Sequence, residues 1–87
     1  MQDILMMVLS DCPYCHMADR MIEELMAEDP AYRALTIKRV DEAVETELAN
    51  SLDYYYVPTF YVEGEKLMEG VPTKEKVKAV LDRALHA

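Results

Sequence analysis

Glycine is nearly absent from this chain, whose 87 residues include two glycines, four prolines and no tryptophan. A flexible linker or a low-complexity tract would need more glycine or proline than this, and no segment repeats along the chain. Just over half of the residues (52%) are hydrophobic, which is sufficient for a globular core. We therefore expect one domain that spans residues 1–87.

Basic residues are scarce as well. Nine lysines and arginines stand against 17 aspartates and glutamates, and the formal net charge is -8. Because nucleic acids and anionic lipid headgroups attract basic surfaces, this balance argues against a nucleic acid or a membrane surface as the partner. We expect proteins or small molecules as partners, and a monomer.

The amino-terminal segment lacks the features of an export signal. Its apolar run, Ile4–Leu9, is much shorter than the ~20 residues that a membrane-spanning helix needs. Asp3 stands where a signal peptide would carry positive charge, and no small-residue cleavage site follows. These observations predict a cytoplasmic protein, in which a close pair of cysteines is more often catalytic or metal-binding than a structural disulfide.

The apolar periodicity changes several times along the chain and predicts four strands and three helices. In the first half of the chain we expect a strand at Ile4–Leu9, a helix from Pro13 to about Glu28 and a strand at Ala34–Val40. A short helix should follow Asp41, with Val44, Leu48 and Leu52 on one face, and two strands, Thr59–Val62 and Glu65–Glu69, should flank a Glu63-Gly64 turn. A last helix, capped by Thr73, should have an apolar face made of Val77, Val80, Leu81, Ala84 and Leu85. Strands joined through a helix are parallel, whereas the closing hairpin is antiparallel. The order β-α-β-α-β-β-α therefore predicts an α/β fold with a four-stranded mixed sheet and three flanking helices.

Both cysteines lie in one short segment, Ser10–His16, with the sequence SDCPYCH. Two thiols at this spacing can close a disulfide, bind a metal or attach a haem. A tetrahedral zinc site needs four ligands, and only His16 and His86 could join Cys12 and Cys15. We therefore expect no metal site and favour redox chemistry of the cysteine pair.

The same segment matches the C-x-x-C-H motif of covalent haem attachment, in which His16 would be one axial ligand and a methionine the other. Covalent attachment usually accompanies export, and no export signal is visible. We therefore expect a colourless protein. A Soret band in its absorption spectrum would overturn this interpretation.

The element order, with a C-x-x-C between the first strand and the first helix, resembles the thioredoxin fold. Within it, Cys12–Cys15 (CPYC) resembles the active-site tetrapeptide of dithiol glutaredoxins, and Tyr56–Phe60 (YVPTF) resembles the cis-proline loop of the same superfamily. The resemblance covers nearly the whole chain. It implies a thiol–disulfide oxidoreductase in which Cys12 attacks a protein or small-molecule disulfide, Cys15 resolves the intermediate, and the pair ends as a Cys12–Cys15 disulfide.

The resemblance also assigns substrate-binding residues. The loop that contains Pro58 would lie beside the cysteines, and the backbone of Val57 would offer hydrogen bonds to the substrate. Pro13 and Tyr14, between the cysteines, are further predicted contacts. Thr73, in the Pro-Thr pair before the last helix, completes the set.

The identity of the external reductant stays open. Many glutaredoxins carry a lysine three residues before the first cysteine, and this chain has Leu9 there. Their Gly-Gly segment is replaced by Met68–Thr73, and the VPTF block is closer to thioredoxin. We expect no bound cofactor, with electrons supplied either by glutathione or by NADPH through a thioredoxin reductase. The other alternative is a non-catalytic carrier of an iron–sulfur cluster shared between two subunits.

Asp11 is expected to modulate the reactivity of Cys12. At the start of the first helix, free backbone N–H groups and the helix dipole favour the Cys12 thiolate by about 0.3–2 kcal/mol. A carboxylate ~5–6 Å away opposes it by about 1–3 kcal/mol, depending on the effective dielectric. The two effects are comparable, so Cys12 should form its thiolate less readily than its motif alone indicates.

Asp11→Asn should therefore raise the thiolate fraction of Cys12 and speed its alkylation by iodoacetamide between about pH 6 and 7. The gain will be smaller than the change in thiolate fraction, because a weaker base is also a weaker nucleophile. A pH profile of alkylation for the wild type and the variant measures the effect. An unchanged or higher midpoint in Asp11→Asn would show that the carboxylate points away into solvent.

Overall fold

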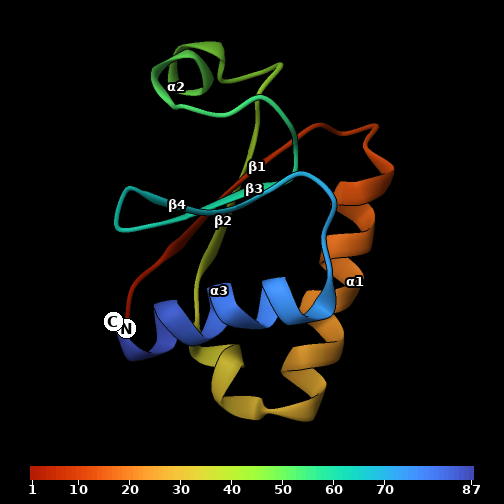
Figure 1. The fold of residues 1–87 in the computed structure, drawn as a ribbon, viewed down its shortest axis with the longest axis vertical. Helices are drawn as coiled ribbons and strands as arrows, with labels where there is room; N and C mark the ends of the chain where they lie inside the picture. Colours follow the sequence, from red (N-terminus) through yellow and green to blue (C-terminus); the bar gives the residue numbers. More distant parts are fainter.

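In the computed structural model, which describes residues 1–87, a four-stranded sheet separates helices α1 and α3 from helix α2 (Figure 1). The elements follow in the order β1 (Ile4–Val8), α1 (Pro13–Glu28), the 3-10 helix η1 (Pro30–Ala34), β2 (Ile37–Asp41), α2 (Thr46–Ser51), β3 (Thr59–Val62), β4 (Glu65–Glu69) and α3 (Lys74–His86). The strand order is β2-β1-β3-β4, in which β1 and β2 are parallel and the other neighbouring pairs are antiparallel. The predicted mixed sheet with three α-helices is confirmed. The expectation that strands joined through a helix are parallel holds for β1 and β2 but is wrong for β2 and β3, because β3 runs antiparallel to β1. None of the helices combines the length and the apolar character that crossing a membrane requires.

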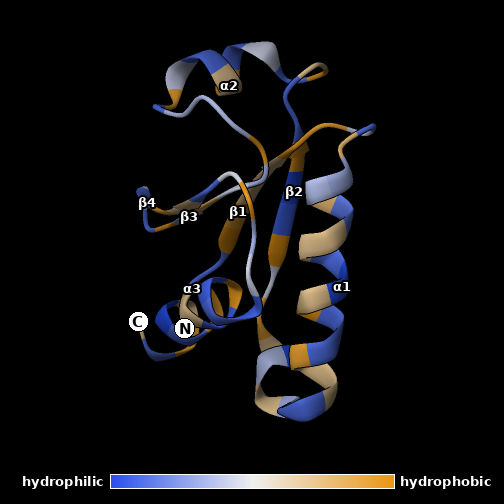
Figure 2. Cartoon of the chain, turned by 45° about the vertical axis from the view of Figure 1, so that its right-hand side comes forward, coloured by the Kyte–Doolittle hydropathy of each residue, from blue (hydrophilic) through white to orange (hydrophobic).

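Strand β1 is apolar along its whole length because both of its faces are covered (Figure 2). Ile4 and Met6 belong to the core on the side of α1 and α3, whereas Met7 belongs to the core on the side of α2. None of these three side chains is exposed. A strand covered on both faces needs a continuous apolar run and not the alternation of a half-buried strand.

The larger core lies between the sheet and helices α1 and α3. It consists of Ile4, Met6, Ala18, Ile22, Leu25, Tyr32, Leu35, Phe60, Val62, Met68, Val77, Val80, Leu81 and Ala84. Its members on α1 and α3 recur every three or four residues, which is the helical period. The face predicted for the last helix is therefore confirmed, with Leu85 packed half-buried at its margin.

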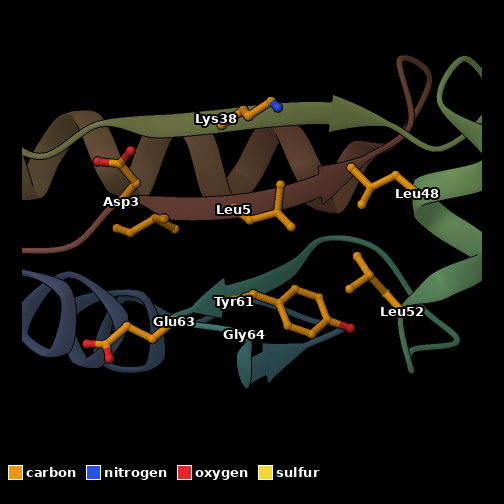
Figure 3. Close-up of a pocket in the computed structure, with 9 residues that line it drawn as sticks. Asp3, Leu5, Lys38, Leu48, Leu52, Tyr61, Glu63 and Gly64 are labelled. Atoms are coloured by element: carbon orange, nitrogen blue, oxygen red, sulfur yellow. The ribbon is translucent and has the colours of Figure 1, made fainter.

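The second face of the sheet has a much smaller core, made of Met7, Val40 and Tyr61. The six-residue helix α2 covers only part of this face and leaves a pocket of about 330 Å³ beside it. Figure 3 shows Leu5 and Tyr61 of the sheet among the residues that line this pocket. Leu48 and Leu52, from α2 and its C-terminal cap, close one end of it. Neither cysteine takes part in this pocket.

The second strand differs from its prediction, because β2 begins at Ile37 and not at Ala34. Ala34 instead ends η1, and Leu35 and Thr36 lie between η1 and β2. The Asp29 carboxylate accepts a hydrogen bond from the backbone N–H of Ala31 (3.1 Å), and Pro30 pre-sets the helical backbone angle. These local bonds compete with an extended backbone, so the strand starts only after the turn has ended.

Tyr32 fixes η1 against α3. Its ring is buried, with 2% of the residue's surface exposed, and its hydroxyl donates a hydrogen bond to Asp82 of α3. The Lys78 ammonium lies 5.9 Å from the centre of the same ring. The 3-10 turn therefore belongs to the packed body of the domain.

The short helix α2 also differs from its prediction. It begins at Thr46, and Val44 lies in the turn before it with 77% of its surface exposed. The backbone N–H of Val44 donates to the carbonyl of Asp41 (3.0 Å), so the chain reverses before the helix starts. Leu48 and Leu52 are half-buried against the smaller core, but the prediction that Val44 shares their face is wrong.

The predicted hairpin turn is confirmed between β3 and β4. Glu63 and Gly64 both have positive φ, at 52° and 78°. A two-residue type I′ turn requires positive φ at both central positions, which glycine adopts without strain.

Phe60→Ala should destabilise the domain by about 3–5 kcal/mol, because it removes a fully buried aromatic side chain and leaves a cavity. Val44→Ala should change the free energy of unfolding by less than ~0.5 kcal/mol, since its side chain is exposed. Urea unfolding of the reduced proteins, followed by circular dichroism, measures both. Equal effects would contradict the place of Phe60 in the core.

Candidate active site

The segment between β1 and α1 places Cys12 at the N-cap of the helix. Its backbone is extended (φ -120°, ψ 107°), and Pro13 follows in the first turn. The Sγ atom of Cys12 accepts a hydrogen bond from the backbone N–H of Cys15 (3.1 Å). A helix start leaves such N–H groups without backbone partners, and Pro13 has none to satisfy. The sulfur therefore takes the place that a side-chain oxygen fills in most caps.

Cys15 lies one helical turn further on and is more deeply buried, with 3% of its surface exposed against 8% for Cys12. Both cysteines are free thiols. Burial raises the pKa of the Cys15 thiol to about 12, and a hydrogen bond with Cys12 and the negative charges of Cys12 and Asp19 act in the same direction. Cys15 therefore keeps its proton at neutral pH. An attacking thiolate in this pair has to come from Cys12.

A loop 45 residues further along the chain lies against Cys12. The Cys12 thiol donates to the carbonyl oxygen of Val57 at a sulfur–oxygen distance of 3.8 Å, and the next peptide bond, Val57-Pro58, is cis. Sheet pairing explains this approach. Met7, near the end of β1, pairs with Thr59, the first residue of β3, so the segment after β1 and the segment before β3 meet at one edge of the sheet.

A groove of about 400 Å³ lies beside this loop. It is lined by Tyr14, Tyr56, Val57, Glu69, Gly70 and Val71. Two of the predicted substrate contacts, Tyr14 and Val57, are therefore part of one concave surface next to Cys12. Pro13 is exposed but does not line this groove.

Thr73 has a structural role at the start of α3. Its hydroxyl accepts a hydrogen bond from the backbone N–H of Lys76 (3.1 Å), which confirms the predicted cap. Thr73 is not among the residues that line the groove. Its contact with a substrate stays a prediction.

Asp19 places a negative charge near the cysteine pair. It follows Cys15 by four residues, which is one turn of α1, and its charge contributes to the raised pKa of Cys15. The Arg39 guanidinium of β2 contacts Asp19 Oδ1 through two nitrogens (2.8 and 2.9 Å). The sequence analysis did not indicate Asp19. Its four-residue distance from Cys15 was the only available signal, and solvent-exposed carboxylates on helices often have such spacings by chance. Asp11 is exposed in the turn before α1, and its effect on Cys12 stays a prediction.

Glu69, at the end of β4, is a second residue that the sequence motifs did not indicate. One carboxylate oxygen accepts hydrogen bonds from the backbone N–H groups of Tyr55 and Tyr56, and the other pairs with Lys66 Nζ (2.9 Å). The hydrogen bond from Lys66, followed by those from the two backbone groups, lowers the pKa of the Glu69 carboxyl to about 2. The carboxylate is therefore ionised at neutral pH. Its backbone partners lie 13 and 14 residues away in sequence, beyond the reach of a local pattern.

No three or more His, Cys, Asp or Glu side chains lie together in a way that could hold a metal ion. His16, the candidate haem ligand, is exposed in the first turn of α1, where its backbone N–H donates to the carbonyl of Cys12 (3.1 Å). It has the environment of an ordinary helix-surface residue. That the protein binds neither metal nor haem stays a prediction.

Comparison with known families identifies the class of protein. A family profile described as a thioredoxin domain matches residues 2–82. The chain therefore belongs to the thioredoxin-domain family. No curated protein sequence gives a significant match.

Solved structures agree with this fold. One described as the structure of a malarial protein superimposes with a TM-score of 0.71 at 16% identity, covering 97% of both chains. The oxidised thioredoxin of Plasmodium falciparum superimposes with a TM-score of 0.70 at 19% identity, covering 94% of this chain and 79% of that one. Oxidised thioredoxin O2 of Arabidopsis thaliana gives 0.58 at 21% identity over 94% and 73%. The predicted thioredoxin fold is thus confirmed, whereas the glutaredoxin-like subtype stays a prediction.

Iodoacetamide at about pH 8 should alkylate Cys12 of the folded, reduced protein and leave Cys15 unmodified, because burial keeps Cys15 protonated. Mass spectrometry should show one adduct under native conditions and two after unfolding. Cys12→Ser is the control and should take up no adduct while folded. Rapid modification of Cys15 in the folded protein would contradict its protonated, buried state.

Proposed function

We propose that this protein is a thiol–disulfide oxidoreductase that reduces disulfides by exchange with the Cys12–Cys15 pair. The observation that carries the proposal is the position of Cys12 Sγ, which accepts the N–H of Cys15 at the start of α1 and lies 3.8 Å from the Val57 carbonyl oxygen. The Cys12 sulfur thus has a donor that stabilises negative charge, and the Val57 backbone lies beside it. Membership of the thioredoxin-domain family supports the same chemistry.

The first step uses Cys12 as the nucleophile. Its thiolate attacks one sulfur of the substrate disulfide, a bond forms between Cys12 and that sulfur, and the second substrate sulfur leaves as a thiolate that takes up a proton. Before the attack, the N–H of Cys15 stabilises the anionic sulfur of Cys12. The raised pKa of Cys15 keeps the second thiol out of this step.

The second step uses Cys15. Its sulfur attacks Cys12 Sγ, the bond between Cys12 and the substrate breaks, and the proton of Cys15 goes to the departing substrate thiolate. The substrate leaves as two thiols, and the protein is left with a Cys12–Cys15 disulfide. The loss of the negative charge on Cys12 in the mixed disulfide removes one of the causes that raise the pKa of Cys15, which favours this step.

The groove beside Val57 favours a substrate with apolar side chains next to its disulfide. Tyr56 and Val71 have 70% and 52% of their surface exposed there, and Tyr14 has 46%. Large apolar side chains that gather at a concave surface commonly mark a binding site. A protein disulfide, or a small disulfide with an apolar body, fits this surface.

Two external reductants are compatible with the site. Leu9 stands where many glutaredoxins have a glutathione-binding lysine, and the matched family is the thioredoxin domain. Both observations support NADPH and a thioredoxin reductase over glutathione. A coupled assay that compares NADPH oxidation through glutathione reductase with that through thioredoxin reductase distinguishes them.

We place this activity in the cytoplasm, because a reducing compartment is needed to keep the pair in its dithiol form. We propose that the protein acts as a monomer. The net charge of -8 supports proteins or small molecules as partners, and neither nucleic acid nor a membrane. No bound cofactor is required, since the two sulfur atoms carry both electrons.

Cys12→Ser should lose all disulfide reductase activity, because the only remaining thiol, Cys15, is more deeply buried and protonated. Cys15→Ser should instead accumulate a mixed disulfide on Cys12, because the resolving thiol is missing. Turbidity from insulin reduction measures the activity, and mass spectrometry shows the adduct as a mass increase equal to the substrate thiol. Activity in Cys12→Ser, or an adduct on Cys15, would show that the roles are assigned wrongly.

A further inference from the structure

The Glu69 carboxylate connects two segments that line the groove. Glu69 Oε2 accepts the backbone N–H groups of Tyr55 and Tyr56, the latter at 2.9 Å, while Oε1 contacts Lys66 Nζ at 2.9 Å. The Glu69 side chain is only 20% exposed. A hydrogen bond to an ionised, partly covered acceptor is stronger than a bond between neutral groups.

The segment between α2 and β3 depends on such bonds because it has no regular secondary structure. The side chains of Tyr55 and Tyr56 are 86% and 70% exposed, so burial does not hold them. Two backbone carbonyl groups of the segment accept hydrogen bonds from side chains of β3: the Tyr61 hydroxyl donates to Asp53 (3.1 Å), and the Thr59 hydroxyl donates to Tyr56. The backbone N–H groups of Tyr55 and Tyr56 both donate to the Glu69 carboxylate.

The same carboxylate joins two segments that line the groove. Tyr56 and Val57 line one part of it, and Gly70 and Val71, which directly follow Glu69, line another. Gly70 adds a second link, because its N–H donates to the Pro58 carbonyl (2.9 Å). Gly70 has a φ of 85°, and a Cβ atom there would lie 3.8 Å from the Cβ of Tyr56. The width of the groove and the position of the Val57 backbone therefore depend on how Glu69 holds the loop.

We propose that Glu69 is a positioning residue for disulfide substrates, which holds the Tyr55–Val57 segment so that the groove accepts an apolar side chain next to the substrate cysteine. This rests on the proposed oxidoreductase function. Glu69 itself lines the groove, and its carboxylate forms hydrogen bonds to Tyr55, Tyr56 and Lys66 and to neither cysteine. Its action is through the backbone of Val57 and the side chain of Tyr56, which face the substrate.

Three variants separate this role from a merely structural one. Glu69→Ala removes both backbone bonds. Glu69→Gln keeps one oxygen as an acceptor for the two N–H groups but loses the charge. Lys66→Met is the matched control, because Lys66 contacts the other carboxylate oxygen and its loss leaves the bonds to Tyr55 and Tyr56 in place.

Amide hydrogen exchange of the reduced protein, measured by NMR, reports on the loop without any substrate. In Glu69→Ala the amides of Tyr55 and Tyr56 should exchange at least about tenfold faster, since they lose their acceptor. The exchange rates of these amides in Glu69→Gln should lie between those of Glu69→Ala and the wild type. Lys66→Met should match the wild type. Unchanged exchange in both Glu69 variants would overturn the proposal.

Steady-state kinetics with two disulfide peptides report on the substrate. One peptide carries leucine and phenylalanine beside its cysteines, and the control peptide carries serines there. Glu69→Ala should raise KM for the apolar peptide by about 5- to 20-fold, because the loop that lines the groove loses its acceptor, with kcat within about twofold of the wild type. KM for the serine peptide should change little, and Glu69→Gln should restore part of the loss.

The outcomes also separate this proposal from the proposed function. Equal changes in KM for the two peptides, or a fall in kcat with KM unchanged, would overturn the positioning role. If the wild type reduced neither peptide, the oxidoreductase function and the substrate role of Glu69 would both be wrong. The exchange rates of Tyr55 and Tyr56 would still decide whether Glu69 holds the loop.

Discussion

The hydrogen bond from the backbone N–H of Cys15 to the sulfur of Cys12 is the interaction on which the site depends. Its donor belongs to the first turn of α1, so the bond exists only while that helix is formed. The helix in turn is held against the sheet by Ala18, Ile22 and Leu25. The Cys12 sulfur is therefore connected to the main hydrophobic core through one turn of helix, and its environment depends on the packing of α1.

The two sides of the site differ in how they are supported. On one side Cys12 is fixed by a 16-residue helix that packs on the larger core. On the other side Val57 belongs to an irregular segment that side-chain and backbone hydrogen bonds hold in place. The six-residue helix α2, which lies on this side of the sheet, covers only part of that face (Figure 1). The Cys12 sulfur, fixed by a packed helix, thus faces a backbone segment whose position is set by polar contacts.

Most of the fold could be predicted from the sequence because its signals are local. The apolar run of β1, the glycine turn at Gly64 and the helical spacing of α3 each act over a few residues. Val44 was misplaced because the chain turns at Asp41, whose carbonyl accepts the N–H groups of Val44 and Glu45, before α2 begins at Thr46. The cysteine pair was evident as the only two thiols of the chain. The hydrogen bond between Glu69 and Tyr56 could not be predicted from the sequence, because the fold of the β3–β4 hairpin brings these residues together and no local sequence pattern indicates such a contact.

The protonated state of Cys15 makes oxidation of the pair a proton-releasing reaction. A thiol with a pKa of about 12 carries its proton in the reduced protein at physiological pH and has none in the disulfide. Each proton released in a two-electron oxidation lowers the reduction potential by about 30 mV per pH unit. The pair therefore becomes a stronger reductant as its surroundings become more alkaline. In the proposed exchange reaction, the thiol of Cys15 thus links the reducing power of the pair to the local pH.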